Sequence, residues 1–113
     1  MKPATPIRLF VVDDHRMFAD GLIELLSAEE DFEIVGDASS ISDAKLTICD
    51  ANVDAVIIDV HLPDGDGFAL HEWITANCKS SNPKMLYVTG DDRVTSINRA
   101  MTLGAMAYLD KTG

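Results

Sequence analysis

Five residues that could take part in one reaction stand within two positions after apolar runs of the sequence. They are Asp13, Asp14, Asp59, Thr89 and Lys111. If the fold brings them together, the clustered carboxylates would raise one another's pKa, and a hard divalent cation such as Mg²⁺ would remove that conflict. A metal-bound carboxylate beside a hydroxyl and an ammonium group can accept a phosphoryl group. The set therefore indicates phosphoryl transfer onto Asp59.

The apolar runs alternate with stretches of helical periodicity. The runs are rich in Val, Ile, Leu and aromatic residues, and they cover residues 7–12, 32–36, 55–58, 85–88 and 105–109. Most do not alternate with polar residues, which is typical of strands buried on both faces. The pattern predicts an α/β fold with a doubly wound parallel sheet of five strands and right-handed crossovers. In such a sheet the ligand site lies beyond the carboxyl ends of the strands, where the five reactive residues stand.

Helices are indicated between the strands by apolar residues three and four positions apart. The positions are Phe18, Leu22, Leu25 and Leu26; Ile41, Ala44 and Ile48; Leu70, Trp73 and Ile74; Val94, Ile97 and Met101. We expect them to face the core rather than a cofactor. Ser40, with Asp43 three residues later, fits a capping box at the start of the second helix. His71 is predicted to be an exposed helix residue.

Composition excludes several classes of protein. The 113 residues fit one domain, and 47% of them are hydrophobic, enough for a core. A net charge of −10 argues against nucleic acid as this domain's own partner. No apolar stretch approaches the roughly 18 residues of a membrane span, and the N-terminus does not resemble a signal peptide. Cys49 and Cys78 are not spaced as a metal pair, and we expect reduced thiols of a cytosolic protein rather than a disulfide.

Four segments of the chain resemble the receiver domain of two-component response regulators. They are VVDDH, IIDVHLPDGDG, VTG and GAMAYLDK, in the family's order and spacing, and the resemblance covers nearly the whole chain. It implies the flavodoxin-like strand order 2-1-3-4-5, of which a receiver domain is itself a standard example. The DDH after the first strand, together with GLIELLSAEEDFEIVGDAS, is most similar to receivers that precede a helix-turn-helix DNA-binding output domain.

The resemblance implies how the acidic residues would act. Asp59 would accept the phosphoryl group from a phosphohistidine of a sensor histidine kinase. Asp14 and Asp59 would bind Mg²⁺ directly, together with the backbone carbonyl of His61. Asp13 would bind the ion through a water molecule.

The resemblance also implies roles for residues after the third strand. Thr89 and Lys111 would hold the phosphoryl oxygens. Tyr108 would be the switch aromatic, turning inward as Thr89 moves towards the phosphate. His61 and Asp91 flank the path of the water that attacks the acyl phosphate, and we expect them to set the lifetime of the phosphoryl group.

The end of the chain departs from the family pattern. Relatives continue past the lysine into a fifth helix, whereas this sequence ends at Gly113. We expect residues 1–113 to be a C-terminally truncated receiver domain, with any output domain outside this chain. Loss of the fifth helix would expose apolar surface and favour a homodimer or a swapped dimer. We expect a cytoplasmic protein whose partner is a sensor histidine kinase, with DNA bound only through an output domain and no membrane contact.

Other interpretations of the same residues stay open. The reactive residues could be ordinary helix starts, turn acids, loop caps or solvated lysines, and Tyr108 could be a core residue. Asp64-Gly65-Asp66-Gly67 is mostly turn chemistry and lacks the glutamate of an EF-hand. His15 and His61 near the same edge leave a zinc site open, although carboxylates favour Mg²⁺.

Two other functions compete with a phosphorylation switch. The first is an aspartate-nucleophile phosphohydrolase of the haloacid dehalogenase type, which resembles this chain in its Asp, Thr or Ser, and Lys. That family needs a second Asp two residues after the nucleophile, where this chain has His61. The second is a pseudo-receiver that serves only as a dimerisation module, for which a missing acid or lysine would have been the sign.

Overall fold

The computed structural model describes residues 5–78, 82–89 and 107–110. The chain forms three helices and seven strands in this part, two of the strands being only two residues long. In chain order they are β1 (Ile7–Val12), α1 (Arg16–Ser27), β2 (Phe32–Ala38), α2 (Ile41–Thr47), β3 (Ala55–Asp59), β4 (His61–Leu62), β5 (Gly65–Asp66), α3 (Gly67–Asn77), β6 (Lys84–Thr89) and β7 (Ala107–Asp110). None of the helices in these ranges is long and apolar enough to cross a membrane.

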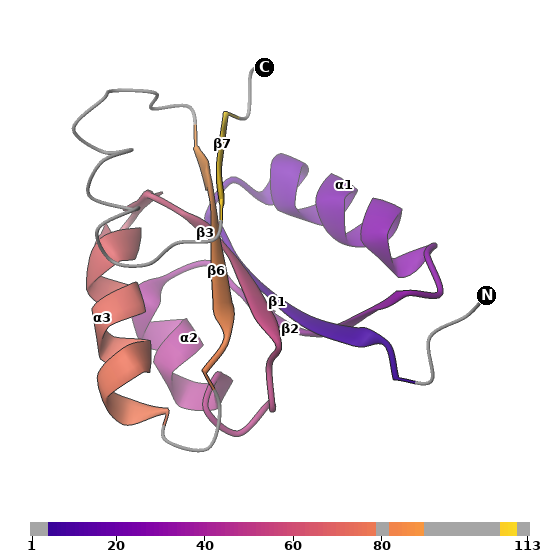
Figure 1. Ribbon diagram of the computed structural model, residues 1–113. Coiled ribbons are helices and arrows are strands. Elements are labelled where there is room, and N and C mark those ends of the chain that lie inside the picture. The colour runs from indigo at the N-terminus through magenta and orange to yellow at the C-terminus, as the bar shows by residue number, and fades with distance from the viewer. Residues whose placement is uncertain (1–4, 79–81, 90–106, 111–113) are drawn as a thin grey trace.

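Five of the strands form one parallel sheet, as the sequence predicts. Their order is β2-β1-β3-β6-β7, which is the order 2-1-3-4-5 expected of the fold. In Figure 1, α1 covers one face of this sheet, while α2 and α3 cover the other. Strands between two helical layers bury both faces, which is why their sequences are apolar throughout rather than alternating.

The core is divided by the sheet into two clusters. Phe10, Val12, Val56 and Ile58 point towards α2 and α3, whereas the intervening Val11, together with Leu9 and Ile57, packs towards α1. This alternation follows from the two-residue period of a strand. The two clusters together fix how far β1 and β3 can slide past one another, and thereby where their carboxyl ends lie.

The predicted apolar faces of the helices are largely confirmed. Ile41, Ala44 and Ile48 are buried in one core cluster with Leu70 and Ile74. The prediction is wrong for Leu25 of the first helix. The fourth set, Val94, Ile97 and Met101, lies outside the described residues.

Leu25 does not face the core, because its side chain is 67% exposed. Ala19 is fully buried and marks the centre of the packed face of α1. Leu25 is six positions after Ala19, which places the two residues about 120° apart around a helix of about 3.6 residues per turn. Phe18, Leu22 and Leu26 pack against the cluster on the sheet, whereas Leu25 lies just beyond Phe18, past the edge of the packed face.

His71 is buried rather than exposed, which corrects the sequence prediction. Its side chain is 6% exposed, and its Nδ1 shares a hydrogen bond of 2.8 Å with the hydroxyl of Tyr87. The aromatic rings of Phe68 and Tyr87 pack with their centroids 5.1 Å apart. A histidine can be buried here because the tyrosine hydroxyl satisfies its ring nitrogen. Burial lowers the pKa of His71 below its ordinary 6.5, and the charge of Glu72 opposes this effect only in part.

The cysteines also differ from the prediction, since Cys49 and Cys78 form a disulfide. Cys49 follows α2 by two residues and Cys78 caps the C-terminus of α3. Both helices lie on the same face of the sheet and end at the same side of the domain (Figure 1), which brings the two Cα atoms to 4.9 Å. A sequence separation of 29 residues gives no sign of this proximity, because it arises only when both crossovers have formed.

We expect the pKa of His71 to make the free energy of unfolding depend on pH. The folded-state pKa lies below the unfolded one, so the contribution is fully present above pH 6.5 and is lost as the pH falls, because the unfolded chain binds the proton first. Because one group titrates, the free energy of unfolding cannot fall by more than about 1.4 kcal/mol per pH unit from this cause. Urea unfolding of the parent and of His71→Gln at pH 7.5 and 5.5 measures it. An equal pH dependence in both proteins would contradict this account.

We expect reduction of the disulfide to lower the free energy of unfolding substantially. The bond closes a loop with a sequence separation of 29 residues, and chain entropy for a loop of this size corresponds to about 3 to 4 kcal/mol. Urea unfolding with and without a dithiol reductant tests this. The double variant Cys49→Ser/Cys78→Ser is the control and should not respond to reductant. Two thiols that react with an alkylating agent in the unreduced, unfolded chain would contradict the prediction.

Candidate functional site

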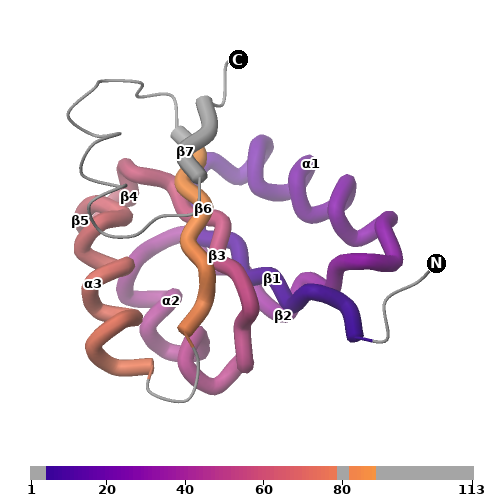
Figure 2. Tube along the Cα trace, viewed as in Figure 1, coloured from indigo at the N-terminus to yellow at the C-terminus, as the bar shows by residue number. Residues whose placement is uncertain are grey.

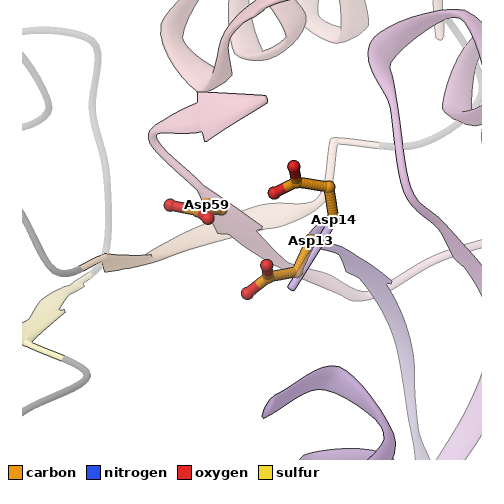
Figure 3. Close-up of side chains that lie close together, drawn as sticks. All are labelled: Asp13, Asp14 and Asp59. Carbon is orange, nitrogen blue, oxygen red and sulfur yellow. The ribbon is translucent and has the colours of Figure 1, made fainter. Parts of the chain in front are cut away.

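Three aspartates from two neighbouring strands meet at the carboxyl edge of the sheet. Asp13 and Asp14 follow β1, and Asp59 is the last residue of β3. Strands β1 and β3 pair in parallel with Val12 opposite Ile58, so their ends coincide. One carboxylate oxygen from each aspartate lies within 4.8 Å of the others (Figure 3). The structure thus brings together the three acids that the sequence singled out.

The arrangement fits a hard divalent cation. Asp13 and Asp59 are only 1% and 5% exposed, whereas Asp14 is exposed. Buried carboxylates this close repel one another, and a cation with oxygen ligands compensates their charge. The exposed side leaves access for water molecules and phosphate oxygens, which Mg²⁺ usually keeps in its coordination shell.

A zinc site receives no support from the described residues. His15 and His61 are both exposed, and the cluster of possible metal ligands within the described ranges consists of aspartates alone. Zinc sites are built mainly from imidazole and thiolate ligands. The oxygen donors therefore favour Mg²⁺ over zinc.

Backbone N–H groups fix the orientation of the two buried carboxylates. The N–H of His15 donates to Oδ1 of Asp13 at 2.8 Å, and the N–H of His61 donates to Oδ1 of Asp59 at 3.3 Å. In both cases the donor lies two residues after the acid, as in an Asx-turn. The N–H of Asp13 in turn donates to the carbonyl of Ala38 at the end of β2, at 3.0 Å. Each acid is therefore held by its own loop.

The segment after Asp59 folds back as a short hairpin. Strands β4 and β5 pair antiparallel, with His61 opposite Asp66, and the N–H of Gly67 donates to the carbonyl of Val60 at 2.7 Å. A Cβ atom at Gly67 would collide with the carbonyl oxygen of Asp59. This close approach explains why the position holds glycine.

The two acids of the hairpin each cap a helix. Asp66 is the N-cap of α3, and its Oδ1 accepts from the N–H of Ala69 at 2.9 Å. Asp64 accepts from the N–H groups of Ile41 and Ser42, the first two residues of α2. These two bonds, that of Ile41 more than that of Ser42, hold the pKa of Asp64 below its ordinary 3.8. Sequence reasoning assigned this stretch to turn chemistry and missed the contact of Asp64 with a distant helix.

The sheet register brings the backbone of another predicted site residue to the same edge. Asp59 lies opposite Val88, so Thr89 is one residue further along the neighbouring strand. Thr89 is in turn opposite Asp110, and Tyr108 is opposite Tyr87. Lys111 and Asp91 lie outside the described residues.

The capping prediction for the second helix is confirmed at its main contact. Ser40 is the N-cap of α2, and its Oγ accepts from the N–H of Asp43 at 3.1 Å. Three successive N–H groups of α2 are therefore satisfied by side chains, one from the local sequence and two from Asp64.

Comparison with known proteins matches residues 9–113 to the family described as response regulator receiver domain. The DNA-binding transcriptional activator DevR/DosR of Mycobacterium tuberculosis is 39% identical over 105 residues, which cover 93% of this chain and 48% of that protein. The transcriptional regulatory protein LiaR of Bacillus subtilis is 33% identical over 110 residues, 94% of this chain and 49% of LiaR. The chain thus spans about half the length of the curated relatives it matches.

Solved structures agree with this match. The crystal structure of a DNA-binding response regulator of the LuxR family from Staphylococcus aureus superposes with a TM-score of 0.84 at 27% identity, covering 95% of this chain and 88% of that one. The sheet order, the acidic cluster at its carboxyl edge and these similarities lead to one assignment. The chain belongs to the response regulator receiver domain family.

Proposed function

We propose that this chain accepts a phosphoryl group on Asp59 and acts as a phosphorylation-dependent switch. The observation that carries the proposal is the position of Asp59, at the buried end of β3 with a carboxylate oxygen within 4.8 Å of those of Asp13 and Asp14. A buried acid in such a cluster is held ready as a nucleophile when a cation compensates the charge. The proposed donor is a phosphohistidine of a sensor histidine kinase.

The proposed transfer forms one bond and breaks another. A carboxylate oxygen of Asp59 attacks phosphorus, the bond between phosphorus and the kinase imidazole breaks, and that nitrogen keeps the electron pair and takes up a proton. The product is an acyl phosphate on Asp59. The N–H of His61, which already donates to Oδ1 of Asp59, restricts the rotation of the nucleophile.

A bound Mg²⁺ ion supplies charge neutralisation for the phosphoryl oxygens. We propose that Asp14, Asp59 and the backbone carbonyl of His61 hold the ion directly, and that Asp13 acts through water. The exposure of Asp14 beside two buried acids supports an ion that lies towards solvent.

Thr89 and Lys111 are proposed to hold the phosphoryl oxygens after transfer. Thr89 ends β6, the strand next to the one that carries Asp59, and this placement supports its role. Tyr108 is proposed to turn inward when Thr89 moves towards the phosphate. The switch would change the partner preference of the surface around β7.

The wider role is proposed from the relatives. DevR/DosR is described as a DNA-binding transcriptional activator and LiaR as a transcriptional regulatory protein. We propose that this receiver domain likewise controls transcription, from the cytoplasm, through an output domain that binds DNA, and that its own catalysis is limited to its phosphorylation and dephosphorylation. A homodimer, with or without swapped elements, is proposed as the assembly.

We expect incubation with Mg²⁺ and acetyl phosphate to add a single phosphoryl group to Asp59, with acetate as the leaving group. Intact mass measures the adduct, which should be absent in Asp59→Asn and when a chelator is present during labelling. Turnover of small phosphomonoesters without an adduct would favour the phosphohydrolase interpretation. Absence of both would contradict the proposed function.

We expect His61 and Asp91 to set the lifetime of the acyl phosphate. His61 is exposed and lies two residues after Asp59, a position that in this family flanks the path of the attacking water. The double variant His61→Ala/Asp91→Ala should change the dephosphorylation rate by about tenfold, equivalent to about 1.4 kcal/mol in barrier height. His15→Ala, which removes an exposed histidine beside Asp14, is the matched control. A double variant that loses phosphate at the parent rate would contradict the prediction.

A further inference from the structure

We propose that Asp64 is a positioning residue for the metal centre, which braces the loop that carries Asp59 against the segment that orients Asp13. The inference rests on the proposed binding of Mg²⁺ by the three aspartates. The Asp64 carboxylate accepts hydrogen bonds from the backbone of α2, and it acts on the acids through that backbone.

The brace consists of one carboxylate that spans two parts of the chain. Asp64 lies at the tip of the β4–β5 hairpin, which Figure 2 shows beside the N-terminal end of α3. Its Oδ1 accepts from the N–H of Ile41 at 2.8 Å, and its Oδ2 accepts from the N–H of Ser42 at 3.0 Å. Both bonds reach across more than twenty residues of sequence, and both involve a charged acceptor, which makes them stronger than bonds between neutral groups.

Side-chain packing tightens the same contact. Gly65 has φ of +152°, and a Cβ atom there would lie 2.8 Å from Cδ1 of Ile41. Leu62 of the hairpin is buried in the same core cluster as Ile41. The hairpin is therefore seated on the first turn of α2 by two hydrogen bonds and by contact with Ile41.

Each end of the brace leads directly to a buried acid. On the α2 side, the carbonyl of Ala38, three residues before Ile41, accepts from the N–H of Asp13. On the hairpin side, the N–H of Gly67 donates to the carbonyl of Val60, the residue after Asp59. A continuous path of short segments and hydrogen bonds thus runs from one acid to the other through Asp64.

Such a path matters because the acids it joins repel one another. When no cation is bound, repulsion favours separation of the two loops, and the brace opposes that separation. A cluster held at binding distance in advance loses less conformational freedom when the ion binds. Removal of the brace is therefore expected to weaken ion binding even though no ligand changes.

An ordinary helix cap would stabilise α2 without any effect on the metal centre. The chain offers a control for this alternative, since Ser40 caps the same helix through the N–H of Asp43. Ser40→Ala removes this cap and a contact of 3.3 Å with the hydroxyl of Ser42, but it keeps both backbone hydrogen bonds from α2 to Asp64. Asp64→Ala removes the link, and Asp64→Asn keeps one acceptor oxygen.

The experiment measures Mg²⁺ binding to the parent, Asp64→Ala, Asp64→Asn and Ser40→Ala by calorimetry, together with thermal unfolding. We expect Asp64→Ala to weaken Mg²⁺ binding by about tenfold, the lower end of the effect of outer-shell partners. Ser40→Ala should lower the melting temperature but keep the parent's affinity, and Asp64→Asn should lie between. Saturating Mg²⁺ should also slow amide exchange at Ile41 and Ser42 in the parent, because coupling between two sites is reciprocal.

Three results would contradict the proposed role of Asp64. They are an unchanged Mg²⁺ affinity in Asp64→Ala, an equal loss of Mg²⁺ affinity in Ser40→Ala, and amide exchange at Ile41 and Ser42 that does not change with Mg²⁺. If Asp64→Ala does not fold, the comparison of Asp64→Asn with Ser40→Ala decides in the same way. Failure of the proposed function is distinguishable, because it is seen in the parent as Mg²⁺ binding without a phosphoryl adduct. Failure of the brace is seen only between variants of a parent that forms the adduct.

Discussion

The main constraint on this structure is the repulsion between carboxylates that the parallel strands bring together at the carboxyl edge of the sheet. Because β1 and β3 pair directly with their ends in register, Asp13 and Asp59 cannot avoid one another once the sheet forms. Burial makes the repulsion stronger than it would be in water. Three surrounding features make this repulsion tolerable. Backbone N–H groups donate to Asp13 and to Asp59, and Gly67 lets the loop after Asp59 close. The third is an exposed side through which a cation can enter.

Much of this could be predicted from the sequence because the decisive signals are local. Unbroken apolar runs indicated strands buried on both faces, and an acid after such a run indicated the edge of a parallel sheet. The strand order came from the resemblance to a family, not from the pattern of residues. The roles of Thr89, Tyr108 and Lys111 stay predictions, since the described structure places only the backbones of the first two.

Apart from Leu25, the features that the sequence did not predict are contacts between elements that are distant in sequence. His71 is polar and sits on a helix, yet the hydroxyl of Tyr87 makes its burial acceptable. Cys49 and Cys78 are 29 residues apart, and only the parallel course of two helices brings them together. Asp64 was assigned to a turn, which is correct locally but omits its bonds to α2. In each case the partner is supplied by tertiary structure, which single-residue preferences do not contain.

The disulfide divides the acidic cluster in a way that matters for the unfolded chain. The covalent ring that runs from Cys49 to Cys78 contains Asp59, the hairpin and α3, whereas Asp13 and Asp14 lie outside it. In the oxidised unfolded state, the segment that carries Asp59 has already lost part of its conformational freedom. When the cluster assembles, most of the remaining loss of conformational entropy therefore falls on the open N-terminal segment with Asp13 and Asp14. Oxidation thus gives the two segments unequal conformational freedom before any strand has paired.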